Sequence, residues 1–261
     1  MRIRVAVAAG ALLATQIATA AAQRTGDRAQ LVFTISGAYI DGKGLWAVPS
    51  QSLQEGGFTT DLALSRSIQN TLGAALAATY YPANNFGLSA EAFLLGLGYD
   101  DACRVTSTDN SARIVEVCEN LDQQDKSAAA AAFSVGGIFR VASREFISPF
   151  ARANVGLAVT NQSSLLTEGV ARNGALLAIY TDAAGTRVRP SFGLGLGATM
   201  VLSRGYHLRW EVRDNIVGLD RITGPTAGLS QNPPHETVYK HLFSVMIGLD
   251  VILERQRGRR Y

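Results

Sequence analysis

Hydrophobic and polar residues alternate along most of the chain with a period of two. In one such run, Leu72, Leu76 and Tyr80 share a face, whereas Thr71 and Thr79 lie on the other. Because successive side chains of a strand point to opposite faces, runs of this kind predict β-strands. Eight runs cover residues 31–36, 71–80, 88–94, 133–141, 151–160, 191–200, 208–213 and 244–251.

Short and long connections alternate between these runs. The short ones fall at residues 82–85, 143–145 and 203–205, and the long polar ones at 41–59, 101–127, 161–186 and 215–238. Outer-membrane barrels have tight periplasmic turns and extended external loops. The alternation of short and long connections therefore predicts an all-β fold. We expect an eight-stranded antiparallel up-and-down transmembrane β-barrel with both ends on the periplasmic side. Residues 58–65 alternate weakly and fit either an extension of the second strand or a loop.

A soluble barrel or sandwich is the alternative, because the period alone does not say which face is inside. The membrane is favoured because the polar faces are rich in Gly, Ala, Ser and Thr, and because the runs carry few charges. Aromatic residues near the short turns also fit a membrane-interface girdle. These aromatics are Tyr80, Tyr81, Phe86, Phe146, Phe150, Tyr206 and Trp210. No segment after the N-terminal region has the eighteen or so apolar residues of a membrane helix.

The first residues have the order of a secretory signal peptide. Arg2 and Arg4 precede an apolar stretch, and Ala20, Ala21 and Ala22 supply the small residues of a cleavage site. We expect residues 1–22 to be cleaved, residues 23–254 to form the barrel and residues 255–261 to form a basic periplasmic tail. An uncleaved membrane anchor is the alternative for the N-terminus, and contact with anionic lipid headgroups is the alternative to a solvated tail.

The charge balance of the mature chain is nearly even. Removal of Arg2 and Arg4 leaves 22 basic and 21 acidic residues, a formal net charge of +1. Such a balance gives no reason to expect nucleic acid as a partner. Export to the outer membrane of a Gram-negative-type bacterium implies membrane lipids, lipopolysaccharide, periplasmic chaperones and the barrel assembly machinery as partners, and we expect a monomer.

Cys103 and Cys118 lie in one polar stretch of the exported chain. In an oxidising compartment this pair predicts a disulfide, since two cysteines are too few for a structural zinc site. The surrounding loop is acidic, and we expect it to be solvated and self-repelling. It has no calcium-binding pattern of the EF-hand type, although divalent bridging to lipopolysaccharide phosphates is a second interpretation.

If the apolar faces meet lipid, seven charged residues share the barrel interior. They are Glu91, Arg140, Arg152, Arg209, Glu211, Arg213 and Asp250. The interior of an eight-stranded barrel is just wide enough for side chains to fill, and buried charges must be paired. We therefore predict a lumen closed by ion pairs. The alternative is a narrow path for ions or small solutes, gated by rearrangement of those pairs.

The histidines and the glycine-rich run of the sequence do not form a catalytic or cofactor-binding pattern. His207, His235 and His241 have no metal-binding spacing, and His241 and Ser244 point to opposite faces of a strand. The glycines of residues 193–198 resemble a dinucleotide motif but lie inside an alternating run with no following helix, and small residues beside large lumen side chains explain them better. We predict a non-enzymatic protein with no cofactor.

The whole mature sequence resembles the outer membrane protein β-barrel domain family, the small OmpA-like membrane barrels. The resemblance rests on the signal, the loop rhythm, the run from Leu208 to Asn215 and the amphipathic run from Phe243 to Leu253. It implies lumen ion pairs and a structural, envelope or surface-contact role. An adhesin-like protein acting through its external loops is a further alternative. The basic tail departs from the terminal aromatic of such chains, and we do not expect a peptidoglycan-binding domain after the barrel, so cell-wall tethering is not carried over from the resemblance.

Overall fold

The computed structural model describes residues 29–253, except 109, 122–128, 142–144, 161–162, 171–173, 175, 183–186 and 204. The predicted signal peptide (1–22) and basic tail (255–261) lie outside the described residues. Eight strands form a closed antiparallel barrel in which every strand pairs with two neighbours. They are β1 (Gln30–Ile40), β4 (Thr71–Tyr81), β5 (Phe86–Gly96), β7 (Ala129–Arg140), β8 (Ile147–Thr160), β11 (Arg187–Ser203), β12 (Tyr206–Ile222) and β13 (His235–Leu253).

Each predicted run falls in one of these strands, except that Val141 of the run 133–141 lies one residue beyond the end of β7, and this confirms the eight-stranded up-and-down barrel. The barrel closes where β1 pairs with both β4 and β13. Its last two strands are longer than expected, because β12 continues to Ile222 and β13 begins at His235. The region 215–238 was therefore wrongly assigned in full to a loop: the ends of the two strands continue as a paired ribbon as far as Ile222 and His235.

The apolar faces of the strands point outward. Leu72 is 75% exposed and Leu194 57%, whereas the inward-facing Thr79 is 3% exposed and Ser244 is 1% exposed. A soluble barrel has the reverse arrangement, with its apolar face inside. An apolar outer wall around a polar interior is the pattern of a barrel that spans a membrane, so the fold is a transmembrane β-barrel.

The long connections are not simple loops, which corrects the sequence analysis. They contain a three-stranded sheet of β2 (Gly44–Glu55), β3 (Phe58–Ile68) and β6 (Tyr99–Val105), the helix α2 (Ala112–Leu121), and a small sheet of β9 (Thr167–Val170) and β10 (Leu176–Tyr180). Together with residues 223–234, these elements form a region that we name the cap. Residues 58–65, left open by the sequence, belong to β3, which pairs with β2 from Phe58 and with β6 from Leu62.

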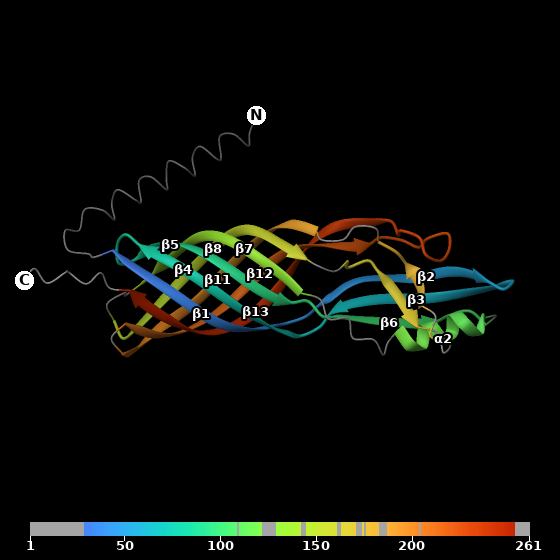
Figure 1. Cartoon of the computed structure of the whole chain (residues 1–261), viewed down its shortest axis with the longest axis horizontal. Coiled ribbons are helices and arrows are strands. Elements are labelled where there is room, and N and C mark those ends of the chain that lie inside the picture. Colours follow the sequence, from blue (N-terminus) through green and yellow to red (C-terminus); the bar gives the residue numbers. More distant parts are fainter. Residues whose placement is uncertain are drawn as a thin grey trace, which may run out of the picture.

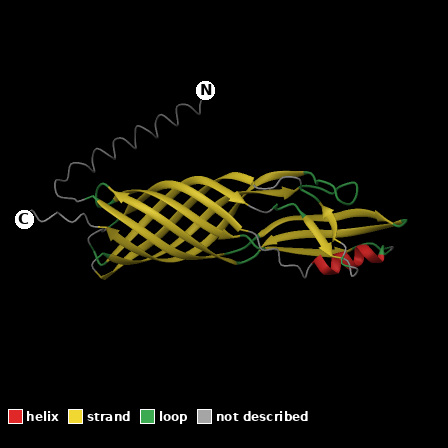
Figure 2. Cartoon of the chain, in the orientation of Figure 1, coloured by secondary structure: helices red, strands yellow, loops and turns green. Residues whose placement is uncertain are grey.

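The cap and the described chain ends lie at opposite ends of an elongated molecule (Figure 1). The strands of the barrel are steeply tilted, and the cap continues along the same axis (Figure 2). The β2–β3 hairpin turns through Gly56 and Gly57, which have φ angles of 59° and 86°. Glycine suits these positions because it has no Cβ to clash in the left-handed region.

A single hydrophobic core runs from the cap into the outer half of the barrel. In the barrel it includes Phe93, Leu95 and Met246, and in the cap it includes Leu53 and Val117. The cap is consequently packed against the barrel mouth rather than tethered to it by flexible loops. No helix among the described residues is long and apolar enough to cross a membrane.

Candidate functional site

The middle of the lumen holds a network of buried ion pairs. Arg213 on β12 reaches across to Glu91 on β5, with Nη1–Oε1 and Nη2–Oε2 distances of 2.6 and 3.1 Å. Arg152 on β8 approaches the same carboxylate, with Nη1 2.8 Å from Oε2. Glu91 thus joins strands from three sides of the barrel wall.

Glu211 is the second centre of the network. Its Oε1 accepts a hydrogen bond from Arg213 Nε at 2.8 Å, and its Oε2 accepts one from Arg209 Nη2 at 2.8 Å. Arg209 also lies 3.8 Å from Asp250 Oδ2, and the other oxygen of Asp250 accepts a hydrogen bond from Thr34 Oγ1 at 2.6 Å. The network therefore contains three arginines and three acids and is electrically balanced.

Arg140, the seventh predicted residue, lies apart from the network near the short turns. It donates to Gln30 Oε1 at 2.9 Å and to the backbone carbonyl of Asn84, and its guanidinium lies 3.8 Å from the centre of the Tyr81 ring. The structure thus brings six of the seven predicted lumen residues together and places Arg140 at the end of the barrel that carries the short turns.

Aromatic side chains complete the packing around the guanidinium groups. Arg209 lies 4.0 Å from the Phe150 ring centre and Arg213 lies 5.7 Å from that of Phe93. Tyr81 and Phe150 are only 5% and 4% exposed, so their assignment to the interface girdle was wrong. Their position in the alternation marks them as inward-facing: each is one residue away from an outward-facing neighbour.

Small residues make room for the network. A Cβ atom at Gly195 would collide with Glu211 Oε1, and one at Gly197 would collide with the Phe150 ring. These glycines belong to the run that superficially resembles a dinucleotide motif. Their role in the structure is close approach of β11 to large lumen side chains.

The lumen is filled above and below the ion pairs. Val32, Tyr81, Ile138 and Phe150 form a small apolar cluster at the end with the short turns, and the larger core that includes Phe93 and Leu95 fills the end next to the cap. The cavities on either side of the network are about 20 and 10 Å³. Since a single water needs about 10–15 Å³, these cavities are no larger than one or two waters.

A second cluster of polar contacts unites the connections of the cap. Arg66 on β3 forms a buried bidentate ion pair with Asp101 on β6, and its Nη atoms donate to the backbone carbonyls of Ser164 and Leu166 at 2.9 and 2.7 Å. Trp46 Nε1 donates to the same Ser164 carbonyl at 3.0 Å. Arg66 therefore links the first, second and third long connections.

Gln51 extends this linkage to the fourth connection. Its Oε1 accepts hydrogen bonds from Tyr180 Oη at 2.9 Å and Thr226 N at 2.8 Å, and its Nε2 donates to the Thr226 carbonyl at 3.0 Å. Burial raises the pKa of Tyr180 above its ordinary value. Burial also raises the pKa of Tyr99 to about 12, although the nearby Arg66 acts in the opposite direction.

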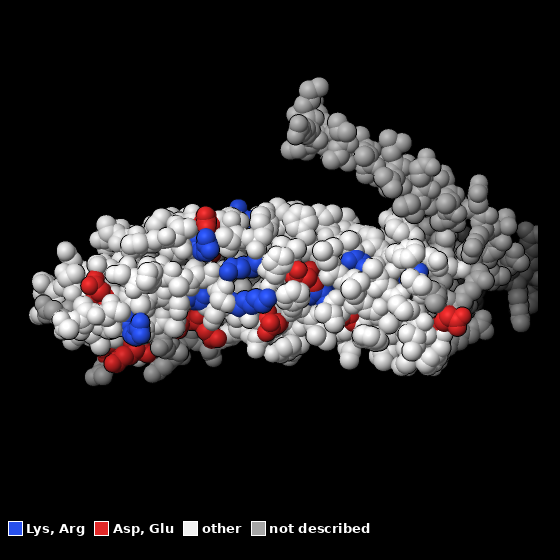
Figure 3. All heavy atoms as spheres, turned by 180° about the vertical axis from the view of Figure 1, so that it is seen from behind, with Lys and Arg blue, Asp and Glu red and all other residues white. Residues whose placement is uncertain are grey.

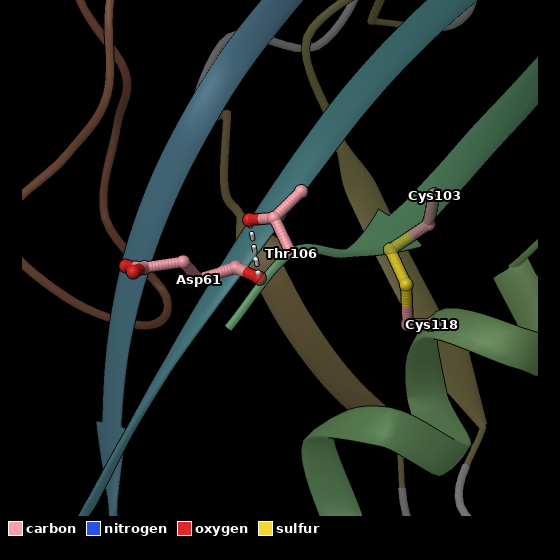
Figure 4. The surroundings of a disulfide bond; sticks show 4 residues. All are labelled: Asp61, Cys103, Thr106 and Cys118. Carbon is pink, nitrogen blue, oxygen red and sulfur yellow. Dashed lines mark hydrogen bonds between the residues drawn. A yellow bond between two sulfur atoms is a disulfide. The ribbon is translucent and has the colours of Figure 1, made fainter. Parts of the chain in front are cut away.

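The disulfide joins the cap sheet to its helix. Cys103 on β6 and Cys118 on α2 are bonded, with Cα atoms 5.3 Å apart (Figure 4). Next to it, Thr106 Oγ1 and Thr106 N both donate to the Asp61 carbonyl, at 3.1 and 2.8 Å. The expectation of a solvated, self-repelling loop was wrong here: Asp101 is buried against Arg66, and Ile114, Val117 and Leu121 bury one face of α2.

The histidines do not converge with other potential ligands. His207 is half-buried near the short-turn end of the barrel, His235 Nδ1 contacts the Pro233 carbonyl, and His241 contacts Asp214 on the outer wall. Within the described part of the chain, no group of three or more His, Cys, Asp or Glu side chains could hold a metal ion.

These features define a class: a small transmembrane β-barrel with a filled lumen and a folded cap at one end. Solved structures support the fold. The chain is similar to the outer membrane protein OprG of Pseudomonas aeruginosa, with a TM-score of 0.50 and 10% identity over 88% of this chain and 98% of that chain. This likeness shows the fold alone.

Two other solved structures align less well. Neisserial surface protein A aligns with a TM-score of 0.42 and 9% identity over 87% of this chain and 99% of that chain. The attachment invasion locus protein Ail of Yersinia pestis aligns with a TM-score of 0.38 and 12% identity over 86% of this chain and 97% of that chain. No protein-family model matches the sequence, and no curated protein matches it either.

Proposed function

We propose that this protein is a non-enzymatic β-barrel of the outer membrane of a Gram-negative-type bacterium, exported through a cleaved signal peptide, and that its barrel anchors the cap at the cell surface for contact with other surfaces. The short connections lie at the end where the described chain begins and ends, and the long ones lie at the other. In outer-membrane barrels the short turns are periplasmic and the longer connections are external. The disulfide agrees with an oxidising compartment.

One observation carries this proposal. In the described lumen, ion pairs occupy the middle and an apolar layer lies on each side of them, and all four long connections contribute to the one folded cap above it. A barrel with this interior supports display better than transport. The narrow-pore alternative would require the central ion pairs and the two apolar layers to rearrange together.

The partners follow from this location. We propose membrane lipids and lipopolysaccharide around the wall, and chaperones and the assembly machinery during biogenesis, with the barrel as a monomer and no nucleic acid bound. Phe58, at the far tip of the β2–β3 hairpin, is 46% exposed. Exposed aromatic side chains are frequent anchors in protein contacts, so Phe58 is a candidate contact residue for the surface-contact role.

Display can be tested with two single-cysteine additions, since both native cysteines are in the disulfide. On intact cells, a membrane-impermeant maleimide should label Gln54→Cys near the cap tip and should label Asn85→Cys in a short turn only after permeabilisation. Equal labelling at both sites in intact cells, or labelling of the turn alone, would reject the orientation.

Closure and contact need separate measurements. In planar bilayers the wild-type protein should show no steady conductance, and a steady open pore would overturn the closed-lumen proposal.

Cells that express Phe58→Ser should adhere to other cells less well than those that express the wild type, at equal surface amounts. Adhesion that is unchanged by Phe58→Ser and by replacement of residues 52–61 with a short turn would remove the surface-contact role.

A further inference from the structure

Asp214 and His241 form a polar pair on the lipid-facing wall of the barrel. His241 Nδ1 lies 2.7 Å from Asp214 Oδ2. The two residues share the outward face of β12 and β13 with Val212 and Phe243, since Asp214 is paired with Phe243 and Ile216 with His241. Ionisable residues on such a wall are costly and therefore mark functional sites by default.

The pair lies at the outer edge of the apolar band. His241 is ten positions along β13 from Val251, which is paired with Tyr206 beside a short turn. Ten residues of a strand tilted by about 40° rise roughly 25 Å along the barrel axis, which is the height of the apolar band of such barrels. His241 is therefore placed where the headgroups of the outer leaflet begin.

A lysine adds positive charge beside the pair. Lys43 Nζ lies 4.5 Å from the centre of the Phe243 ring, and Phe243 is two residues from His241 on the same strand face. His241 is 56% exposed on its side-chain surface. Asp41, which is also exposed, donates its backbone N–H to the Phe243 carbonyl. Two basic side chains thus flank one exposed aromatic ring.

Asp214 retains an unused acceptor. Its Oδ1 is buried with no hydrogen-bond partner among the described residues. A buried acceptor without a donor is unfavourable, so this oxygen favours a ligand that brings an N–H or O–H group. The site consequently combines the basic side chains of Lys43 and His241 with a carboxylate acceptor.

A groove runs along the wall beside this cluster. It has a volume of about 750 Å³ and includes Asp214 and Phe243. The outward-facing Gly137, Ala151 and Ala153 give it depth, because their side chains are much shorter than those of Phe139 and Leu196 on its sides. An apolar groove of this form fits a hydrocarbon chain.

We propose that this cluster and groove bind lipid A, the acylated and phosphorylated glycolipid of the outer leaflet. Its phosphate is held by Lys43 and His241, an amide or hydroxyl group donates to Asp214 Oδ1, and one acyl chain lies in the groove. Asp214 acts by holding the imidazole through Nδ1, which leaves Nε2 for the phosphate. This inference rests on the outer-membrane location in the proposed function and does not depend on lumen closure or on surface contact.

The barrel offers its own control. A second wall groove of about 720 Å³ is lined by Phe33, Leu76, Ala90 and Phe133. Its one ionisable lining residue is Glu91, whose carboxylate points into the lumen toward Arg213. Figure 3 shows one side of the molecule, where the charged side chains gather mainly on the cap and near its junction with the barrel. A charged cluster beside a wall groove is therefore not a general property of this surface.

The test is native mass spectrometry of the purified full chain in phosphatidylcholine nanodiscs with a small fraction of lipid A. The wild type should retain one lipid A. Retention should fall roughly tenfold in Lys43→Gln/His241→Gln, which corresponds to about 1.4 kcal/mol. It should fall similarly in Ala153→Phe, which fills the charged groove, and should be unchanged in Ala90→Phe, which fills the uncharged one.

Two further arms identify the chemistry. The wild type should retain dephosphorylated lipid A as poorly as the double variant retains intact lipid A. At the same fraction in the nanodiscs, it should retain phosphatidylglycerol less than lipid A. Equal retention by the wild type, the double variant and both Phe variants would overturn the proposal, as would preference for phosphatidylglycerol. Heat-modifiable gel mobility identifies folded protein, and Asp214→Asn provides a milder variant that should weaken retention with the barrel intact.

Discussion

Arg213 and Glu91 connect opposite regions of the barrel wall through two hydrogen bonds, of 2.6 and 3.1 Å, across the lumen from β12 to β5. Both side chains are almost fully buried, at 2% and 3% exposure. A buried ion pair need not make the fold more stable than a pair of apolar residues at the same positions would. Loss of one partner, however, leaves the other charge buried and uncompensated. This asymmetry makes the network testable.

Glu91→Gln should destabilise the barrel by about 3–5 kcal/mol, since Arg213 and Arg152 both lose a carboxylate. The free energy of unfolding in urea, from the folded and unfolded bands in gels of liposome-reconstituted protein, measures this effect. Glu145→Gln is the matched control, because Glu145 is exposed. A double change, Glu91→Met with Arg213→Met, should recover part of the loss. If the double variant is less stable than Glu91→Gln, burial of an unpaired charge is not the cause.

The filling of the lumen predicts that the ion pairs alone do not hold it closed. Arg152→Ala should leave planar-bilayer conductance at the wild-type level, because the apolar layers that contain Phe93 and Phe150 remain. A change that also opens these layers, Arg152→Ala with Phe93→Ala and Phe150→Ala, should give measurable conductance in folded protein. Steady current through Arg152→Ala alone would show that the network is the principal barrier.

The barrel interior was predictable and the cap was not, for a physical reason. Alternation assigns a side to every strand residue, so Glu91, Glu211 and Arg213 could be placed in the lumen from the sequence. The same rule would have placed Tyr81 and Phe150 inside, but their closeness to short turns suggested a girdle. The cap depends on pairing between separate connections, such as β3 with β6, and local sequence does not encode which distant segments pair.

Arg66 illustrates what was missed. It follows Leu62 and Leu64 on the same face of β3, and all three side chains are buried. From the sequence, however, an arginine beside a weakly alternating segment is expected to be solvated. Arg66→Met should therefore unfold the cap locally, at a cost of about 3–5 kcal/mol, because it removes the buried ion pair with Asp101 and the hydrogen bonds to the Ser164 and Leu166 carbonyls. Hydrogen exchange should rise in residues 99–105 and 163–167 but not in the barrel strands. Arg104→Met, at an exposed position of β6, should leave the exchange rates of both segments unchanged. Equal exchange rates in the Arg66 and Arg104 variants would show that Arg66 does not link the connections.

The disulfide should stabilise the cap independently of the barrel. Replacement of both Cys103 and Cys118 by Ser removes a cross-link across a sequence separation of 15 residues. A loop of this size contributes about 3 kcal/mol in the chain-entropy model. External protease should then cleave near α2 in intact cells, while heat-modifiable mobility of the barrel stays normal. Protease resistance equal to that of the wild type would mean that packing of Val117 and Leu121 is sufficient.

Alkaline pH should loosen the cap through Tyr99. Its pKa is raised to about 12 by burial, from an ordinary value of 10, so the unfolded cap loses this proton more readily than the folded one. The contribution of Tyr99 to stability is fully present below pH 10 and is lost as the pH rises toward 12, by up to about 2–3 kcal/mol. Near-ultraviolet circular dichroism and tyrosinate absorbance should show the transition, and Tyr99→Phe should shift it to higher pH. An unshifted transition in Tyr99→Phe, with Tyr206→Phe as the exposed control, would assign alkaline loosening to another group.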